Sequence, residues 1–425
     1  MRFISYWHDT APPFTAGETG PVRGEYDVAI IGGGFTGLSA ARHLARAGAR
    51  VAVLEAEHVG FGASGRNGGH LNNGIAHSFA AARAEFGAER AAALYHAYDR
   101  AVDVIEEIVA EEGIDCSFRR AGKLKLASKP QHFAAIASNF EAVHREVDPD
   151  TELLNKGDLH GEIGSDAFHG AMLSKKSAMM HMGRYVVGLA EAAKRAGATI
   201  FEHAPVRACQ RNGLGWEVTT PGGRLQAGHV LLATGAYTPP EFPYQRRRVL
   251  SVGSFIVATR PLSETEAATV MPGNRTCVTS LNIGNYFRLS PDRRLIFGGR
   301  ARFSARSDQQ SDAKSGAILR RSLAAIFPTL ADVEIGYCWG GLVDITQDRF
   351  PRAGVQDGLH YALGYSGHGA QLSTLMGIMM AEKMLGRRVD NPFEGLPWPA
   401  IPFYSGKPWF LPVIGAYYGL LDRIR

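Results

Sequence analysis

The hydrophobic pattern near the N-terminus changes period twice. Val28–Ile31 is a continuous apolar run, which is typical of a parallel strand covered on both faces. Apolar residues then recur at helical spacing from Leu38 to Ala45, and Gly48 follows at a place where helices often end. A second apolar run occupies Val51–Leu54. The pattern predicts a strand, a helix and a second, parallel strand.

The turn between the first strand and the helix is rich in glycine. Gly32, Gly34 and Gly37 form G-x-G-x-x-G, and Glu55 closes the second strand. In such a turn the glycines let the backbone approach a pyrophosphate, and the helix N-terminus supplies partial positive charge. A carboxylate at the end of the second strand accepts hydrogen bonds from a ribose and would repel the 2′-phosphate of NADP. The segment therefore predicts a dinucleotide-binding site and argues against NADP.

Two later segments indicate which dinucleotide. The apolar segment HVLLATG ends at Gly235, and a strand pattern over Leu359–Leu363 leads through a glycine-rich turn into a helix from Ala370. Strands that return so late in the chain predict a core interrupted by an inserted domain. The N-terminus of the helix from Ala370 forms a second site that favours an anion, and in a flavoenzyme it would face the pyrimidine carbonyl of the flavin, which gains negative charge on reduction. Because no second G-x-G-x-x-G lies between a strand and a helix, we expect the substrate itself to supply electrons.

Period-two alternation marks several segments between these elements. GKLKLAS, RRVLSVGSFIVATRPL, TSLNIGNYFRLS and RRLIFGGRAR are predicted strands. We expect an antiparallel sheet with one face towards a pocket, and Tyr286, Arg288 and Arg300 are the candidate pocket residues. The amphipathic segments Phe79–Ile114 and Ser311–Ile326 are predicted covering helices.

Composition excludes several classes of protein. Of the 425 residues, 45% are hydrophobic and 20% charged, so a sizeable core is possible. The 50 glycines follow no repeat, which excludes collagen. The four cysteines lie far apart in the sequence and give no support to a zinc ribbon, an iron–sulfur cluster or a disulfide framework. No metal site is predicted.

The charge balance is mild, because 46 basic and 41 acidic side chains give +5. Arginines are scattered apart from the run Arg246–Arg248, so nucleic-acid binding is not predicted. No apolar stretch is long enough to span a bilayer, and the first residues lack the apolar core of a secretion signal. We expect a soluble, cytoplasmic protein. The short apolar stretch Trp409–Leu421 would dock on its own domain, form an oligomer contact or lie on a membrane surface.

Four motifs together resemble a known family. They are the glycine turn through Glu55, GFGASGRNGG at residues 60–69, WGG at 339–341 and GYSGHGA at 364–370. They resemble the FAD-dependent D-amino acid oxidase/glycine oxidase superfamily, and within it the γ-glutamylputrescine oxidase-like branch. The resemblance implies an α/β fold, in which a glutathione-reductase-type FAD-binding Rossmann domain is interleaved with an α+β substrate domain built on an antiparallel sheet. The implied ranges are 26–85, 170–245 and 335–390 for the FAD-binding domain, 86–169 and 246–334 for the substrate domain, and 391–425 for an apolar tail.

The resemblance also implies the residues of the site. FAD would contact Gly32, Gly34, Phe35, Thr36, Gly37, Glu55, Ala56, Ser64, Gly65, Arg66, Asn67, Gly68, Gly69, Val206, Ala233, Thr234, Gly235, Gly341, Gly367, His368, Gly369 and Ala370. The candidate catalytic residues are His70, Tyr286, Arg288, Arg300, His368 and Gln371. Four polar members of these sets have a plainer alternative. Arg66 and Asn67 would form an ordinary polar turn, His368 would be a spacer whose backbone alone matters, and His70 would be a solvated loop histidine.

Departures from the sarcosine oxidase branch narrow the chemistry. That branch links its flavin to a cysteine at the position of Gly341, whereas the neighbouring cysteine here is Cys338, so we expect non-covalent FAD. Two basic residues that hold a substrate carboxylate in that branch correspond to Asn73 and Gln371. A carboxylate would therefore be held elsewhere, for instance by an arginine of the pocket. Otherwise the substrate is an amine, or a larger molecule whose acid lies far from the reacting carbon.

The resemblance implies oxidation of a CH–NH bond of an amine or amino acid by hydride transfer to FAD, giving an imine that hydrolyses. O2 is the expected acceptor and H2O2 the product. The alternative is a dehydrogenase that passes electrons to a quinone or a protein, which membrane contact through the C-terminal tail would suit. A non-catalytic FAD-binding subunit is a further alternative.

Overall fold

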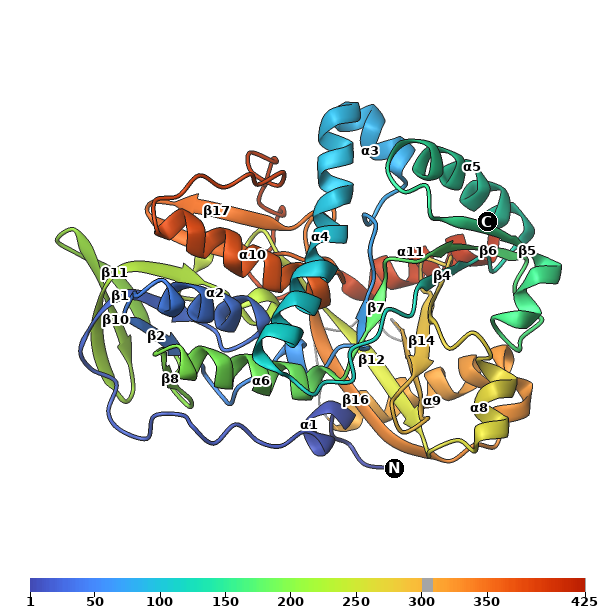
Figure 1. Cartoon of the computed structure of the whole chain (residues 1–425), viewed down its shortest axis with the longest axis horizontal. Coiled ribbons are helices and arrows are strands. Elements are labelled where there is room, and N and C mark those ends of the chain that lie inside the picture. Colours follow the sequence, from blue (N-terminus) through green and yellow to red (C-terminus); the bar gives the residue numbers. More distant parts are fainter. Residues whose placement is uncertain (300–308, 425) are drawn as a thin grey trace.

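The computed structural model describes residues 1–299 and 309–424. A first sheet and its helices form one half of the molecule and a second sheet forms the other, with helix α4 (Ala88–Glu112) running between them (Figure 1).

The first sheet has the predicted strand–helix–strand unit at its centre. β1 pairs in parallel with β2 and β11, and β18 pairs in parallel with β11. Val28–Ile31 and all of Val51–Leu54 are buried, as expected for strands covered on both faces. In spatial order the strands are β17 (Arg352–Gln356), β18 (Leu359–Leu363), β11 (Gly223–Leu232), β1 (Glu25–Ile31), β2 (Val51–Leu54) and β8 (Thr199–Phe201), with β10 (Gly215–Thr220) beside β11 and β9 (Ala208–Asn212) beside β10.

Helix α2 (Phe35–Arg46) follows the glycine turn and packs against α6 (Met182–Arg195) and α10 (Gly369–Met384). The α2–α10 contact is close, since a Cβ on Gly377 of α10 would lie 2.3 Å from the carbonyl oxygen of Thr36. This contact brings the N-termini of α2 and α10, which are far apart in sequence, to the same part of the molecule.

The second sheet is antiparallel among the described strands except where β4 pairs with β13. One of its faces is apolar and packs with α9 (Gln309–Ile326) in a core that includes Leu124, Leu126 and Phe287. In spatial order the strands are β16 (Ile335–Ile345), β12 (Leu250–Thr259), β15 (Leu295–Gly299), β14 (Asn285–Leu289), β13 (Thr276–Thr279), β4 (Lys123–Leu126), β6 (Gly170–Ser174) and β5 (Glu152–Asn155).

Three elements lie on the other side of the domain boundaries that the sequence indicates. β6 and β16 fall in the ranges 170–245 and 335–390, yet both pair within the second sheet. α4 falls in the range 86–169, yet it packs on α6 and α10 of the first half. Strand pairing and helix packing decide which half an element joins, and the chain crosses between the halves accordingly.

The prediction of one helix over Phe79–Ile114 was wrong. Two helices, α3 (Phe79–Phe86) and α4, meet at Gly87, whose φ of 82° is outside the helical region. The Gly87 amide donates to the carbonyl of Arg83 and ends α3. The hydrophobic pattern continues through this position, so it gave no sign of the break.

The C-terminal tail ends in helix α11 (Leu411–Ile424), which docks on the second half. The Asp422 carboxylate accepts hydrogen bonds from the amides of Asn282, at 2.9 Å, and Ile283, at 2.8 Å. The other face of α11 leaves Val413 and Tyr417 exposed. Among the described helices, none is both long and apolar enough to cross a membrane.

Candidate active site

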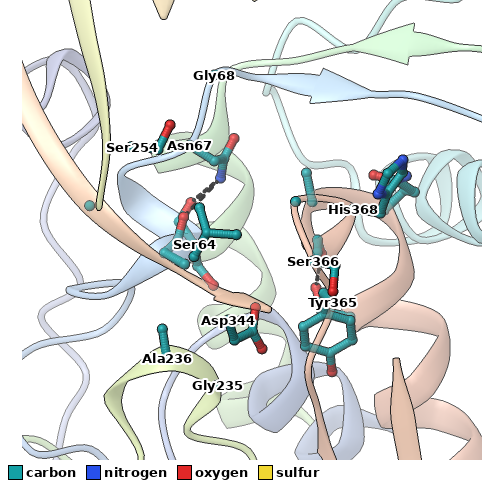
Figure 2. A pocket seen from close by; sticks show the side chains of 18 of the residues that line it. Ser64, Asn67, Gly68, Gly235, Ala236, Ser254, Asp344, Tyr365, Ser366 and His368 are labelled. Carbon is teal, nitrogen blue, oxygen red and sulfur yellow. Dashed lines mark hydrogen bonds between the residues drawn. The ribbon is translucent and has the colours of Figure 1, made fainter. Parts of the chain in front are cut away.

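A cavity of about 860 Å³ lies at the junction of the two sheets. Its walls come from the β1–α2 turn, the end of β2, the loop before β3 (His70–Leu71), the turn before α10 and the polar face of the second sheet. Figure 2 shows Ser64 and Asn67 on one side of this space and Ser366 and His368 on the other.

Most of the predicted cofactor residues line this one cavity. The lining members are Gly32, Gly34, Phe35, Thr36, Glu55, Ala56, Ser64, Arg66, Asn67, Gly68, Val206, Ala233, Thr234, Gly235, Gly341, Gly367, His368, Gly369 and Ala370. Gly37, Gly65 and Gly69 lie behind this surface, where they permit close packing.

The glycine turn has no room for side chains. Gly32 has a φ of 114°, and a Cβ there would lie 2.7 Å from the carbonyl oxygen of Ala233. A Cβ on Gly37 would lie 2.0 Å from the carbonyl oxygen of Gly32. The turn therefore leaves backbone alone at the start of α2, where helix amides favour an anion such as a pyrophosphate.

Glu55 stands at the end of β2 and faces the cavity. Its carboxylate accepts from the amides of Gly33, at 2.6 Å, and Glu57, at 2.9 Å. Burial raises the pKa of this carboxyl, and the two amide donors partly offset the increase. The side chain is thereby held in place to accept hydrogen bonds from a ribose.

The loop over residues 60–69 is organised by its own polar side chains. Asn67 Nδ2 donates to the carbonyls of Ala63, at 3.1 Å, and Ser64, at 2.9 Å (Figure 2). Arg66 Nε donates to the carbonyl of Phe61 at 2.8 Å, and Nη1 donates to Gly340 at 3.2 Å. Arg66 and Asn67 therefore shape the turn, as the plainer alternative expected, and they also line the cavity.

The turn before α10 is held by an acid of β16, Asp344, which sequence reasoning missed. Asp344 is buried, its carboxylate accepts from the Gly364 amide at 2.6 Å, and its backbone carbonyl accepts from the Ser366 amide at 2.7 Å. Burial raises the pKa of Asp344 to about 6. The available signal was a single acid inside the otherwise apolar strand of WGGLVDI.

His70 is buried against the second sheet, so its interpretation as a solvated loop histidine was wrong. Its Nε2 lies 3.3 Å from the carbonyl oxygen of Phe287, and its ring meets Tyr286 edge to face with 5.5 Å between centroids. Burial lowers the pKa of His70 to about 3. The imidazole is therefore neutral at ordinary pH, while the Tyr286 hydroxyl lies 2.9 Å from Ser254 Oγ.

Arg288 does not line the cavity, which removes it from the candidate substrate contacts. It is buried, and it donates to the carbonyls of Gly68, at 3.2 Å, and Met180, at 2.7 Å. A strand pattern cannot tell which face of the sheet each residue occupies. The other candidate arginine, Arg300, lies outside the described residues.

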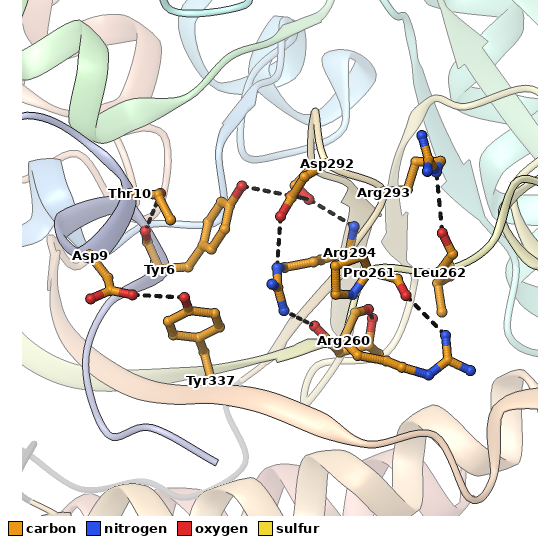
Figure 3. A network of polar contacts seen from close by, with 12 residues as sticks. Tyr6, Asp9, Thr10, Arg260, Pro261, Leu262, Asp292, Arg293, Arg294 and Tyr337 are labelled. Atoms are coloured by element: carbon orange, nitrogen blue, oxygen red, sulfur yellow. Dashed lines mark hydrogen bonds and ion pairs between the residues drawn. The ribbon is translucent and has the colours of Figure 1, made fainter.

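The N-terminal helix α1 (Tyr6–Thr10) joins the second sheet to the loop over residues 60–69. Tyr6 donates to Asp292 at 2.7 Å, and Tyr337 donates to Asp9 at 2.7 Å (Figure 3). On its other side, Trp7 Nε1 donates to the Asn67 carbonyl at 2.5 Å, and Ser5 Oγ donates to Gly65 at 2.6 Å. No motif in the sequence predicted this role for the segment.

The positions matched to the two basic residues differ in their surroundings. Gln371 lines the cavity and donates to the Asn72 carbonyl at 2.6 Å. Asn73 is buried behind the cavity, where it donates to Asp99 at 3.0 Å. Two cations that the sequence analysis missed, Lys123 and Lys125, do line the cavity. Their signal was the alternation K-L-K-L, which places both on one face of a strand.

The residues present fit FAD. One continuous cavity connects a glycine turn at a helix N-terminus, a carboxylate at the end of β2 and a second helix N-terminus at α10. A Cβ on Gly341 would lie 3.0 Å from Arg66 Cβ. The absence of a side chain at Gly341 therefore lets Arg66 pack closely against this part of the cavity wall. All four cysteines are described and none lines the cavity, which agrees with non-covalent attachment.

Residues 27–383 match the family described as FAD dependent oxidoreductase, or DAO. The chain belongs to this family, and the expected fold and cofactor are confirmed: it is an FAD-dependent oxidoreductase.

Similar proteins agree with this assignment. The chain is 34% identical to the probable oxidoreductase OrdL of Haemophilus influenzae, over 94% of this chain and 92% of that one. It is also 34% identical to the gamma-glutamylputrescine oxidoreductase of Escherichia coli, over 94% and 93%. The crystal structure of glycine oxidase from Geobacillus kaustophilus superposes with a TM-score of 0.75 at 24% identity, covering 89% of this chain and 99% of that one.

Proposed function

We propose that this protein oxidises the CH–NH bond of an amine or amino acid to an imine and that O2 is the final electron acceptor. The two electrons and two protons lost by the substrate reduce O2 to H2O2. Water then hydrolyses the imine to a carbonyl compound and ammonia or an amine. The observation that carries the proposal is that His70, Tyr286 and Gln371 line the same cavity as the turn before α10. The names of the similar gamma-glutamylputrescine oxidoreductase and glycine oxidase support an amine or amino acid as substrate.

The cofactor would lie extended along the cavity. Gly32, Gly34 and the first turn of α2 would hold its pyrophosphate, and Glu55 its ribose. The loop over residues 64–69 and the turn before α10 would hold the flavin, whose charge the positive end of that helix favours. FAD, when bound, supplies the two-electron oxidant.

The substrate side of the cavity needs no dedicated base. The Tyr286 hydroxyl is able to hydrogen-bond an amine and orient its CH bond, while the neutral His70 ring packs against Tyr286 without placing a charge beside the substrate. Enclosure in the cavity lowers the pKa of a bound ammonium, so the amine loses its proton to solvent before oxidation.

The alternative acceptor is a quinone at a membrane surface, and one observation favours it. Trp409, Val413, Tyr417, Leu420 and Ile424 are exposed, and their spacing of three or four residues places those within α11 on one face. Flotation with lipid vesicles tests this alternative, because a protein that remains with the unbound fraction does not use α11 as a membrane anchor.

The test of the proposed function is anaerobic mixing of the FAD-loaded protein with amines and amino acids, followed by air. Polyamines, γ-glutamylated amines, cyclic imino acids and N-methyl amino acids form the panel. Bleaching of the flavin absorbance by one class identifies the substrate. Fast recovery in air together with H2O2 supports O2 as acceptor, whereas slow recovery favours a quinone or a protein. If no member of the panel bleaches the flavin, the proposed function is wrong.

A further inference from the structure

Two lysines of β4 face the cavity from the second sheet. Along Lys123–Leu126 the side chains alternate, so that Leu124 and Leu126 are fully buried in the apolar core while Lys123 and Lys125 line the cavity. β4 is an inner strand, between β13 and β6. Two ammonium groups on one face of this strand attract a ligand of opposite charge.

The strand register gives the place of the lysines relative to the candidate catalytic residues. Lys125 pairs with Val278 of β13, and Val278 pairs with Tyr286 of β14. All three line the cavity. Two strand spacings separate Lys125 from Tyr286, so their backbones lie about 10 Å apart across the sheet. The lysines therefore lie on the same cavity wall as Tyr286. A substrate that reaches both would need several bonds between the group at Tyr286 and the group at the lysines.

Lys123 keeps hydrogen-bond donors for a ligand, and the two acids behind the cavity, Asp99 and Asp148, are shared with Lys176. Lys123 Nζ donates to the Asn73 carbonyl at 2.5 Å, and an ammonium has two further hydrogens to donate. Asp99 and Asp148 lie behind the cavity, where Lys176 is 3.1 Å from Asp99 and 3.6 Å from Asp148.

The acidic residues of the described cavity wall are Glu55, Glu57 and Asp344, and none of them comes from β4 or the strands beside it. Burial lowers the pKa of Lys123 to about 8, although the charges of Asp99 and Asp148 raise it, and the side chain of Lys125 is exposed where it lines the cavity.

We propose that Lys123 and Lys125 form an anion subsite that binds a carboxylate carried by the substrate at the end remote from its oxidised CH–NH bond. This inference rests on the proposed function. A substrate with a free amine at one end and a carboxylate at the other would span the wall between Tyr286 and β4. A simple diamine would place its second cation beside the two lysines and would bind poorly.

The C-terminal helix supports the same end of the cavity. Asn282 lines the cavity, and its amide and side chain both donate to the Asp422 carboxylate of α11, at 2.9 and 2.8 Å. The tail thus holds a loop of the same cavity wall in place.

The experiment compares matched substrates and matched variants. ω-Amino acids with four to eight carbons are compared with the amino alcohols of the same length, using the FAD-loaded protein and measuring kcat and KM. Lys123→Met and Lys125→Met remove each charge and keep a long side chain. Lys175→Met removes a lysine that pairs with Glu152 outside the cavity, and it serves as the control. Calorimetric titration with glutarate and with its uncharged diamide, glutaramide, provides a binding measurement that does not depend on turnover.

The subsite predicts a lower KM for ω-amino acids than for amino alcohols in the unmodified protein. Each subsite variant should raise the KM for the ω-amino acid roughly 10- to 100-fold, with little change for the amino alcohol, in kcat or in bound FAD. Glutarate should bind more tightly than glutaramide, and the subsite variants should lose this difference. Equal KM values for the two series, or equal effects of Lys125→Met and Lys175→Met, would overturn the subsite and leave the proposed function standing. Binding of glutarate without oxidation of any amine would overturn the proposed function and this inference about its substrate.

Discussion

The guanidinium of Arg288 lies over the indole ring of Trp7, with 5.2 Å between Cζ and the ring centroid. Both side chains are buried, and each donates to the loop that carries the expected flavin contacts, Arg288 to Gly68 and Trp7 to Asn67. A cation is attracted to the face of an indole, and the attraction grows when water is excluded. The N-terminal helix and the second sheet thus hold this loop together.

The first prediction concerns this pair. Trp7→Phe keeps an aromatic ring under Arg288 but removes the N–H donor and leaves the Asn67 carbonyl without that partner. We expect the free energy of unfolding to fall by about 1–3 kcal/mol and FAD to bind several-fold more weakly. Denaturant unfolding and fluorescence titration of the apoprotein with FAD measure the two effects. Trp409→Phe, at a position 71% exposed, is the control. Unchanged values for both measurements in Trp7→Phe would show that α1 does not support the loop.

The second prediction concerns the glycine turn. Gly37→Ala would place a Cβ 2.0 Å from the carbonyl oxygen of Gly32, and because backbone is on both sides the turn must move. We expect a folded protein that is purified without yellow colour. The matched control is Gly157→Ala, because a Cβ there meets nothing within 4 Å. Full FAD content in Gly37→Ala would contradict the assignment of this turn to the pyrophosphate.

The third prediction is a loss of stability in mild acid. Burial lowers the pKa of His181 to about 4, as it does for His8, and that of His70 to about 3. The unfolded chain protonates these imidazoles near their ordinary pKa of 6.5, so the free energy of unfolding decreases as pH falls from 6.5 towards 4. At about pH 5 each imidazole should cost roughly 1–2 kcal/mol.

His181 offers a test of this mechanism. Its Nδ1 accepts from the Arg184 amide at 3.2 Å and caps α6, which a protonated ring is unable to do. His181→Asn keeps an acceptor at the N-cap and has no titration in this range, so its unfolding free energy should depend less on pH. His96→Asn, on the exposed side of α4, is the control. An unchanged pH slope in His181→Asn would exclude this histidine as a source of the acid instability.

The fourth prediction is that FAD is released intact by denaturation. Gly341 occupies the wall where a linking cysteine is expected in the sarcosine oxidase branch, and the four cysteines lie outside the lining. After acid precipitation, the yellow colour should remain in the supernatant and the protein band on a denaturing gel should show no flavin fluorescence. Colour that stays with the pellet would mean that another side chain forms a covalent link.

The core of the first half was predictable because its signals are local. The runs Val28–Ile31 and Val51–Leu54, the glycine spacing between them and the strand Leu359–Leu363 each specify their own backbone conformation over a few residues. Such a segment needs no knowledge of its distant neighbours. The resemblance of the motifs to a known family then indicated that the bound dinucleotide is FAD.

The site beyond the cofactor was decided by the tertiary structure. Arg288 and Lys125 both belong to predicted strands with the same alternation, yet Arg288 is buried against Trp7 while Lys125 faces the cavity. The sequence by itself determines that alternate residues share a face. Which face meets a cavity depends on contacts between residues hundreds of positions apart, such as Trp7 and Arg288, because burial and charge compensation arise only when the two sheets and the N-terminal helix pack together.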